Sequence, residues 1–246
     1  MHKKRRSKEN QSKKRWKNWL TNFLLVILLI VGLVLIFNEQ IKNQIVKQTT
    51  ATNRIEHMTP KKIKKNEQKK ADFNFEQVKS LDFDTIIQAR LNQDQLAILG
   101  GIAVPSVQLN LPIIKGVSNY SLAVGAGTMK EEQVMGSGNY ALASHHMINE
   151  SLLFSPLVNV NVGSLIYLTD LSNVYTYKIT MKEYVTPDQV QVIEDVAGKK
   201  LVTLVTCDTT GDKRLIVQGE LVSASSTKEA SEEAKEAFNI ATNTYK

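Results

Sequence analysis

The first feature of the chain is an uninterrupted apolar run near its N-terminus. From Phe23 to Phe37 no side chain is charged or can form a hydrogen bond. Counted from Trp19, the segment has 19 residues, which as a helix span about 28 Å, close to the roughly 30 Å core of a bilayer. Trp16 and Trp19 suit the headgroup level at its entry side. The pattern predicts a transmembrane anchor over residues 18–37.

Two other interpretations of this run fit less well. A cleaved signal peptide needs a small-x-small cleavage site, and the stretch NEQIKNQIVKQ after Phe37 contains none. A buried core helix would have a polar side, whereas this run is apolar on all faces. We therefore expect an uncleaved anchor.

Beyond the anchor the pattern changes several times. Residues 38–74 are polar and rich in Lys, which predicts a solvated tether or frayed helix; binding to anionic lipid or wall polymer is the alternative to a plain spacer. Residues 75–91 carry apolar side chains at helical spacing and predict one or two short helices. From Leu96 onward, short β-rich runs are broken by turn residues. Residues 228–246 predict a polar tail with an exposed, peripheral helix.

The β-rich part predicts a single domain over residues 75–227. Its candidate strands are Leu96–Val104, Val107–Ile114, Tyr140–His145, Ser164–Thr169, Val174–Tyr184, Leu201–Thr206 and Leu215–Leu221. Seven or eight short strands with few helices indicate a mainly β fold, either a small barrel or a sandwich.

The charges are unevenly distributed along the chain, whose net charge is +7. Residues 1–17 hold nine Lys or Arg and one Glu, and residues 38–70 hold nine and three. Residues 71–246 hold thirteen basic and twenty acidic side chains, so the folded part is not expected to bind nucleic acid. Only Lys42 and Lys47 are basic in the fifteen residues after the apolar run. The positive-inside rule therefore places the N-terminus in the cytoplasm and everything after the anchor outside.

Cys207 is the only cysteine, which excludes an internal disulfide and a Cys-rich zinc site. It ends a strand-like run and precedes a turn, so its thiol is expected at the sheet rim, within reach of a substrate; a buried structural cysteine is the alternative. A thiol nucleophile needs a base or a nearby cation, and the folded domain offers only His145 and His146. Arg214 opens the next strand and could meet an oxyanion or hold a substrate carbonyl, or be a solvated strand-end charge.

Three short motifs together resemble the sortases of Gram-positive bacteria. They are TLVTC at 203–207, LASH at 142–145, and RLIV at 214–217. The similarity covers roughly residues 75–225 and includes the layout of a basic end, a single anchor, and a β-domain with His, Cys and Arg in that order. It implies an eight-stranded sortase-type β-barrel.

The same resemblance extends to one class of the family. The connection from about Tyr184 to Lys200 is too short for the long helix of class B sortases. The C-terminal apolar segment and the Asp-Pro-aromatic lid of the pilin-building class C enzymes are both lacking in the sequence. The chain therefore resembles class A, and most of all the streptococcal and lactic-acid-bacterial type.

The resemblance implies a cysteine transpeptidase acting on secreted proteins that carry a C-terminal LPxTG signal. Cys207 would attack the Thr carbonyl and form a thioester as the Gly-led tail leaves. His145 would protonate the leaving amine and deprotonate the incoming one, while Arg214 would hold the substrate backbone or support the oxyanion. The acceptor would be an amino group of a peptidoglycan precursor, lipid II. The alternatives are a thiol hydrolase or endopeptidase, a pilin-polymerising sortase, or a non-catalytic anchored binding module.

The resemblance further suggests an apolar groove for the Leu-Pro part of the signal. Several of its residues could equally be plain core residues; the set is Ala143, Val190, Val192, Ile193, Val205 and Thr206.

Some class A sortases bind calcium through acidic residues before the His strand and after the sixth strand. Glu131, Glu132, Glu194 and Asp195 lie in those regions, and a hard cation needs several converging oxygens. Lys130 beside the first pair argues against a site, as does the streptococcal resemblance. We expect no cofactor and no required metal.

Overall fold

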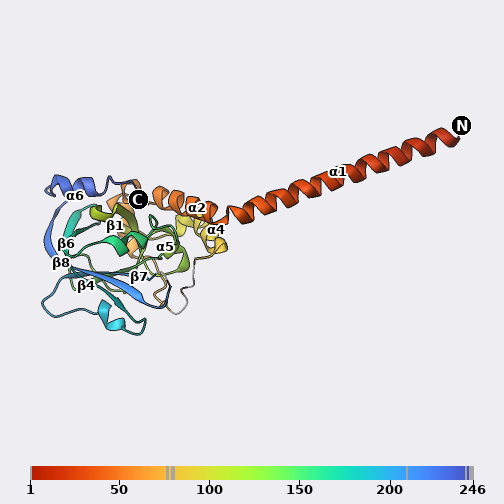
Figure 1. Ribbon diagram of the computed structural model, residues 1–246. Coiled ribbons are helices and arrows are strands. Elements are labelled where there is room, and N and C mark those ends of the chain that lie inside the picture. The colour runs from red at the N-terminus through yellow and green to blue at the C-terminus, as the bar shows by residue number, and fades with distance from the viewer. Residues whose placement is uncertain (1, 76–77, 79–80, 209, 242, 244–246) are drawn as a thin grey trace. The chain divides into compact units, whose positions relative to one another are not determined.

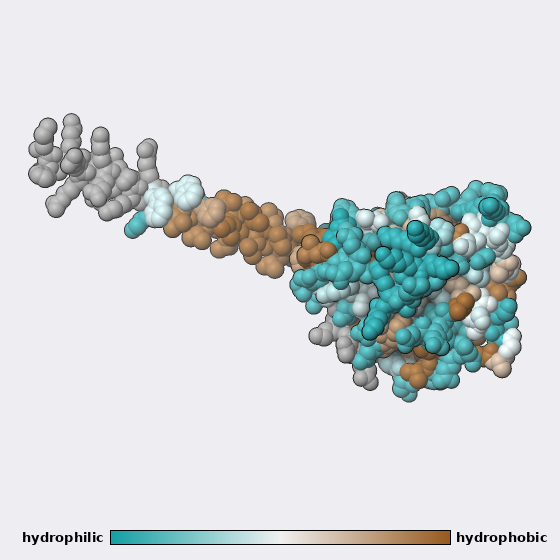
Figure 2. Space-filling model, turned by 180° about the vertical axis from the view of Figure 1, so that it is seen from behind, coloured by the Kyte–Doolittle hydropathy of each residue, from teal (hydrophilic) through white to brown (hydrophobic). Residues whose placement is uncertain are grey.

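The computed structural model describes residues 2–75, 78, 81–208, 210–241 and 243, and only the backbone of residues 2–15. The chain divides into two units, Met1–Lys42 and Asn43–Lys246. The first consists mainly of helix α1 (His2–Ile36). Its segment Trp16–Ile36 is exposed, and is long and apolar enough to cross a membrane; the hydrophobic side chains of this helix are the brown stretch in Figure 2.

The second unit is built around a closed barrel of eight strands (Figure 1). The strands are β1 (Ile98–Val104), β2 (Leu109–Ile114), β3 (Ala126–Thr128), β4 (Asn139–Ala143), β5 (Leu165–Thr169), β6 (Asn173–Val185), β7 (Leu201–Cys207) and β8 (Arg214–Ser226). Around the barrel they follow the order β1-β2-β3-β4-β7-β8-β6-β5. The predicted mainly β barrel is confirmed, and all seven candidate strands are found with shifted ends. The additional strand, β3, has three small residues, too few for a periodic signal.

Short helices connect the strands. Helix α4 (Phe83–Leu91) forms the second half of the predicted helical stretch, of which residues 76–77 and 79–80 lie outside the described residues. The others in the barrel region are η3 (Gln93–Gln95), η4 (Pro105–Val107), α5 (Asn119–Val124), η5 (Ser155–Asn159) and η6 (Val190–Ile193).

The strand directions bring two separate chain segments to one rim. The pairs β2–β3 and β4–β7 are parallel, and the other neighbouring pairs are antiparallel. Strands β4 and β7 begin side by side, with Asn139 opposite Leu201, and stay in register up to Ala143 opposite Val205. The residues that follow them therefore emerge next to each other.

The two faces of these strands belong to different apolar clusters. Alternate side chains point into the barrel and join its main core, among them Leu142, Val202, Leu204, Leu215 and Val217. The residues between them point outward, and Ala143, Val205 and Ile216 form part of a second cluster. This outer cluster adjoins the rim where β4 and β7 end.

The structure differs from the predicted tether over residues 38–74. The segment folds into α2 (Asn38–Thr52), η1 (Ile55–His57) and α3 (Pro60–Glu67), and these elements bury Val46, Ile55 and Ile63. Asn66, also buried, donates a hydrogen bond from Nδ2 to the Ile98 carbonyl oxygen at 2.9 Å. The buried apolar residues are so widely spaced between lysines that they form no periodic stripe in the sequence.

The C-terminal tail contains the predicted helix, α6 (Glu232–Ala237), but it is not peripheral. Its Ala234 and Ala237, together with Ala230 just before the helix, pack in a cluster with side chains of β1, β5 and β6. Beyond the helix, the carbonyl oxygens of Phe238 and Ile240 accept hydrogen bonds from the side chains of Arg54 and Asn110. The C-terminal tail is thus joined both to Arg54, between α2 and η1, and to the barrel.

Candidate active site

The ends of β4 and β7 put the single thiol and a histidine at the same rim of the barrel. The ladder continues one step past β4, because Ser144 N–H donates to the Val205 carbonyl oxygen and Thr206 Oγ1 donates to the Ser144 carbonyl oxygen at 2.9 Å. Ala143 lies opposite Val205 in parallel register, so β4 ends two residues before His145 at the same end of the barrel at which β7 ends at Cys207. The sequence pattern could not show this, because it depends on the parallel pairing.

Arg214 completes the group from the next strand. It begins β8 and lies directly opposite Cys207 in the antiparallel β7–β8 pair. Its Nη1 donates to the carbonyl oxygens of Gly211 and Lys213 at 3.0 and 3.2 Å, which holds the guanidinium against the β7–β8 turn. The three predicted catalytic residues thus share one rim of the barrel.

The imidazole of His145 is held in its neutral form by burial. Burial lowers its pKa to about 4, so the ring is neutral at neutral pH. Its Nε2 atom is buried and has no hydrogen-bond partner among the described residues. The backbone of His145 is held by a hydrogen bond, in which the Phe154 N–H donates to the His145 carbonyl oxygen at 3.2 Å.

His146 has a different environment. Burial lowers its pKa as well, but Asp208 and Glu150 oppose that shift by favouring the charged ring. Asp208 follows Cys207 and anchors the β7–β8 turn, where its backbone N–H donates to the Lys213 carbonyl oxygen. His146 therefore faces the acidic side of the rim.

The outer cluster at the rim where β7 ends includes four of the six predicted groove residues. Ala143 and Val205 are buried in it, and Val192 and Ile193 of η6 pack against it half-buried. The prediction missed its other buried members, Val117, Leu122, Val185 and Ile216. Of these, only Ile216 could have been found, because it is two residues beyond Arg214 on the same face of β8.

Two predicted groove residues are placed elsewhere. Thr206 lies on the opposite face of β7 from Val205 and Cys207, and its buried hydroxyl is used by Ser144. Val190 is 65% exposed and does not join the outer cluster, because the irregular η6 turn points it to solvent. Neither residue is part of the outer cluster, and their contact with a bound peptide stays a prediction.

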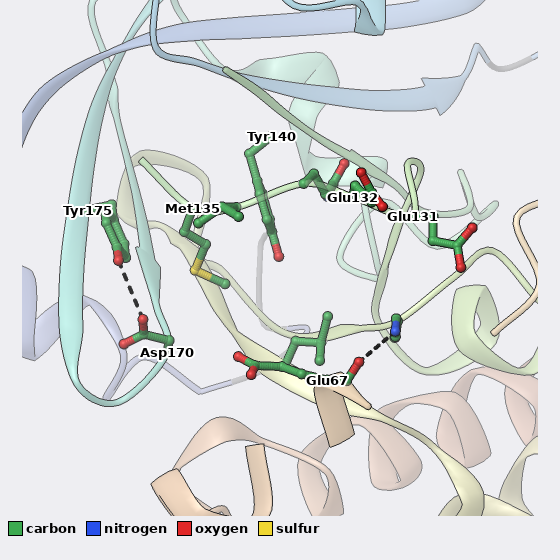
Figure 3. A pocket seen from close by; sticks show the side chains of 11 residues that line it. Glu67, Glu131, Glu132, Met135, Tyr140, Asp170 and Tyr175 are labelled. Carbon is green, nitrogen blue, oxygen red and sulfur yellow. Dashed lines mark hydrogen bonds between the residues drawn. The ribbon is translucent and has the colours of Figure 1, made fainter. Parts of the chain in front are cut away.

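The acidic residues considered for calcium do not converge. Glu131 and Glu132 line a cavity of about 470 Å³ (Figure 3), which also contains Tyr140 near the start of β4, at the other end of that strand from His145. Asp195 is bound by Lys130, with Nζ to Oδ1 at 2.6 Å, and this hydrogen bond holds the pKa of the Asp195 carboxyl below its usual range. Among the described residues, no three His, Cys, Asp or Glu side chains gather as metal ligands.

We expect chelation to change activity little, because the Lys130 ammonium already lies on the carboxylate that a cation would need. The measurement is the transpeptidation rate with EDTA and after adding calcium back. A strong loss with EDTA that calcium reverses would mean that the acidic residues rearrange around an ion.

The comparisons with known proteins agree with this geometry. Residues 102–222 match the sortase domain family. The chain is 43% identical to sortase A of Streptococcus agalactiae, over 90% of this chain and 92% of that protein. It is 44% identical to sortase A of Listeria monocytogenes, over 82% and 91%. The solved structure of the Listeria monocytogenes enzyme, 42% identical, covers 57% of this chain and 97% of its own with a TM-score of 0.54.

Proposed function

Because the chain belongs to the sortase family of cysteine transpeptidases, we propose that it cleaves an LPxTG sorting signal between Thr and Gly. It then joins the released surface protein to an amino group of a peptidoglycan precursor, lipid II. The observation that supports this most is that His145 and Cys207 lie at one rim of the barrel, where the parallel β4–β7 pair ends next to the outer apolar cluster.

In the proposed reaction, Cys207 Sγ bonds to the Thr carbonyl carbon and the Thr–Gly C–N bond breaks. The neutral imidazole of His145 accepts the thiol proton and passes it to the leaving amine. The incoming amine then attacks the thioester, and its surplus proton returns through His145 to the Cys207 thiolate as the new amide forms. One amide bond is broken and one is made, so no external energy source is required.

The groove supplies the recognition. In this proposal the groove is formed by Ala143, Val205, Val192 and Ile193, apolar residues of the outer cluster that suit the Leu and Pro side chains preceding the scissile bond. Removing this surface from water on binding gives affinity without involving the reacting atoms. Arg214 opposite the thiol is suited to hold the substrate backbone or the developing oxyanion.

The catalytic unit is further proposed to lie outside the cell, held by a single membrane span. Helix α1 supplies a segment of suitable length and composition. The nine basic residues within 1–17 and the two within 38–52 favour a cytoplasmic N-terminus.

The deciding experiment is mass spectrometry of the protein with an LPxTG peptide and an added amine. We expect an acyl adduct on Cys207 and a peptide amide that contains the amine. A free acid as the sole product, even with amine present, would identify a thiol hydrolase instead. Lack of any cleavage, with peptide binding unaffected by thiol alkylation, would indicate a non-catalytic anchored module.

Replacing Arg214 with lysine should not be conservative. The guanidinium is planar and offers parallel donors, whereas the ammonium is a point charge on a flexible stem. Loss of one oriented donor at an oxyanion typically costs about 10²–10³ in rate, and we expect a fall of that size in kcat/KM with an unchanged circular dichroism spectrum. Lys213→Ala is the control and should be nearly silent. Near wild-type activity of Arg214→Lys would indicate a long-range charge effect only.

A further inference from the structure

The β6–β7 connection, residues 186–200, carries Val192 and Ile193 to the groove and has little that holds it in place. Within this stretch all side chains other than those two are exposed. Its only regular element is the single turn of η6. Something outside the connection must therefore fix the position of its backbone.

The buried side chain that does so is Asn139, the first residue of β4. It is 1% exposed, and its Nδ2 donates to the carbonyl oxygens of Val192 and Glu194 at 3.1 and 3.0 Å. The two acceptors flank Ile193, so the carboxamide is hydrogen-bonded to the backbone on both sides of that residue. Both amide protons are used in this way.

The orientation of the Asn139 carboxamide is fixed by side chains of the neighbouring strands. Its Oδ1 accepts a hydrogen bond from the buried hydroxyl of Thr203 on β7 at 2.7 Å. That hydroxyl oxygen accepts in turn from Nε2 of Gln218 on β8 at 3.0 Å. With Oδ1 held by the Thr203 hydroxyl, the amino group can only point at the connection.

A second set of hydrogen bonds, to Asp195 of the same connection, is weaker. The backbone N–H of Asn139 and Lys130 Nζ both donate to Asp195 Oδ1, at 2.8 and 2.6 Å. The Asp195 side chain is 66% exposed, and exposed ion pairs contribute little because water screens them. The carboxamide of Asn139, which is shielded from water, is the stronger of the two.

We propose that Asn139 is a positioning residue for substrate recognition, which holds Val192 and Ile193 against the outer cluster so that the groove exists before the peptide arrives. This rests on the proposed function. The residue touches the connection and not the reacting atoms, so its loss should weaken binding of the ground state and of the transition state equally. Such a change raises KM and leaves kcat unaltered.

The test is the near-isosteric variant Asn139→Asp, assayed with an LPxTG peptide and an amine. The carboxylate still accepts from Thr203, but it turns an oxygen instead of a donor toward two carbonyl oxygens. We expect KM for the peptide to rise by about tenfold or more, since two buried hydrogen bonds are lost. We expect kcat, and the rate of Cys207 alkylation by iodoacetamide, to stay within about twofold of wild type.

The matched control is Asn110→Asp. Asn110 is also 1% exposed and also donates from Nδ2 to two backbone carbonyl oxygens, those of Phe238 and Ile240, both at 2.8 Å. It holds the C-terminal tail instead of the groove. The Asn110→Asp variant should lower the melting temperature in the same way as Asn139→Asp while leaving KM for the peptide unchanged.

An unchanged KM in Asn139→Asp, or an equal rise in both Asp variants, would overturn the proposal. If Asn139→Asp does not fold, Thr203→Val decides: it releases the carboxamide from its fixed orientation, and a raised KM at unchanged kcat supports the proposal, while an unchanged KM overturns it. A wild-type protein that makes no product from the LPxTG peptide would instead reject the proposed function itself.

Discussion

Replacing Cys207 with alanine is expected to abolish transpeptidation, because the chain contains no other thiol. Alanine keeps a small side chain at the half-buried end of β7, so the barrel should remain folded. Without Sγ there is no atom to carry the acyl group between the two amines. The measurement is product formation from an LPxTG peptide and an amine, followed by mass spectrometry.

The control for this variant is its fold. Its circular dichroism spectrum and melting temperature should stay close to those of the wild type, since Arg214 opposite and Thr206 beside it keep their backbone pairing. Product above background in a preparation free of wild-type protein would show that Cys207 is not the nucleophile.

The second large effect is expected at His145. Replacing it with alanine should lower kcat/KM by about 10³-fold or more, judged against the 10²–10⁴ typical of general acid–base groups. The register of β4 and β7 puts this residue at the rim of the barrel where Cys207 ends β7, and its buried Nε2 has no partner among the described residues. The ring would be missing both as acceptor of the thiol proton and as donor to the leaving amine.

His146→Ala is the internal comparison and should cost much less. Neighbouring side chains in an extended segment point to opposite sides, and His146 is the one influenced by Asp208 and Glu150. Steady-state kinetics of both variants on the same peptide would settle the order. Greater damage from His146→Ala would assign the proton transfers to that residue and overturn the choice of His145.

The strands could be predicted because they depend on local patterns, and the candidate catalytic residues could be named because they stand in short motifs. Alternation along the chain shows the strands, and the same alternation in TLVTC places Val205 and Cys207 on one face and Thr206 on the other. The assignment of Thr206 to the groove ignored that rule. The direction of the Val190 side chain could not be predicted in the same way, because the single turn of η6 has no repeating pattern of inward and outward residues.

The folding of residues 38–74 and the hydrogen bonds that hold the β6–β7 connection could not be predicted, because both depend on partners far away in the sequence. Val46, Ile55 and Ile63 are buried by surfaces that only the folded barrel provides. Asn139 looks like an ordinary polar residue at the start of a strand. Its partners, Val192 and Glu194, are backbone groups more than fifty residues further along the chain.

The parallel pairing of β4 with β7 also determines when in folding the reactive pair can exist. Joining Ser144 to Thr206 closes a loop of 62 residues, and the entropy lost in closing such a loop must be offset by contacts across the whole sheet. A chain whose barrel is still open carries a thiol with no imidazole beside it. A newly made molecule therefore has little means of forming acyl adducts until its last strands are in place, and the thiol becomes reactive together with the groove that selects its substrate.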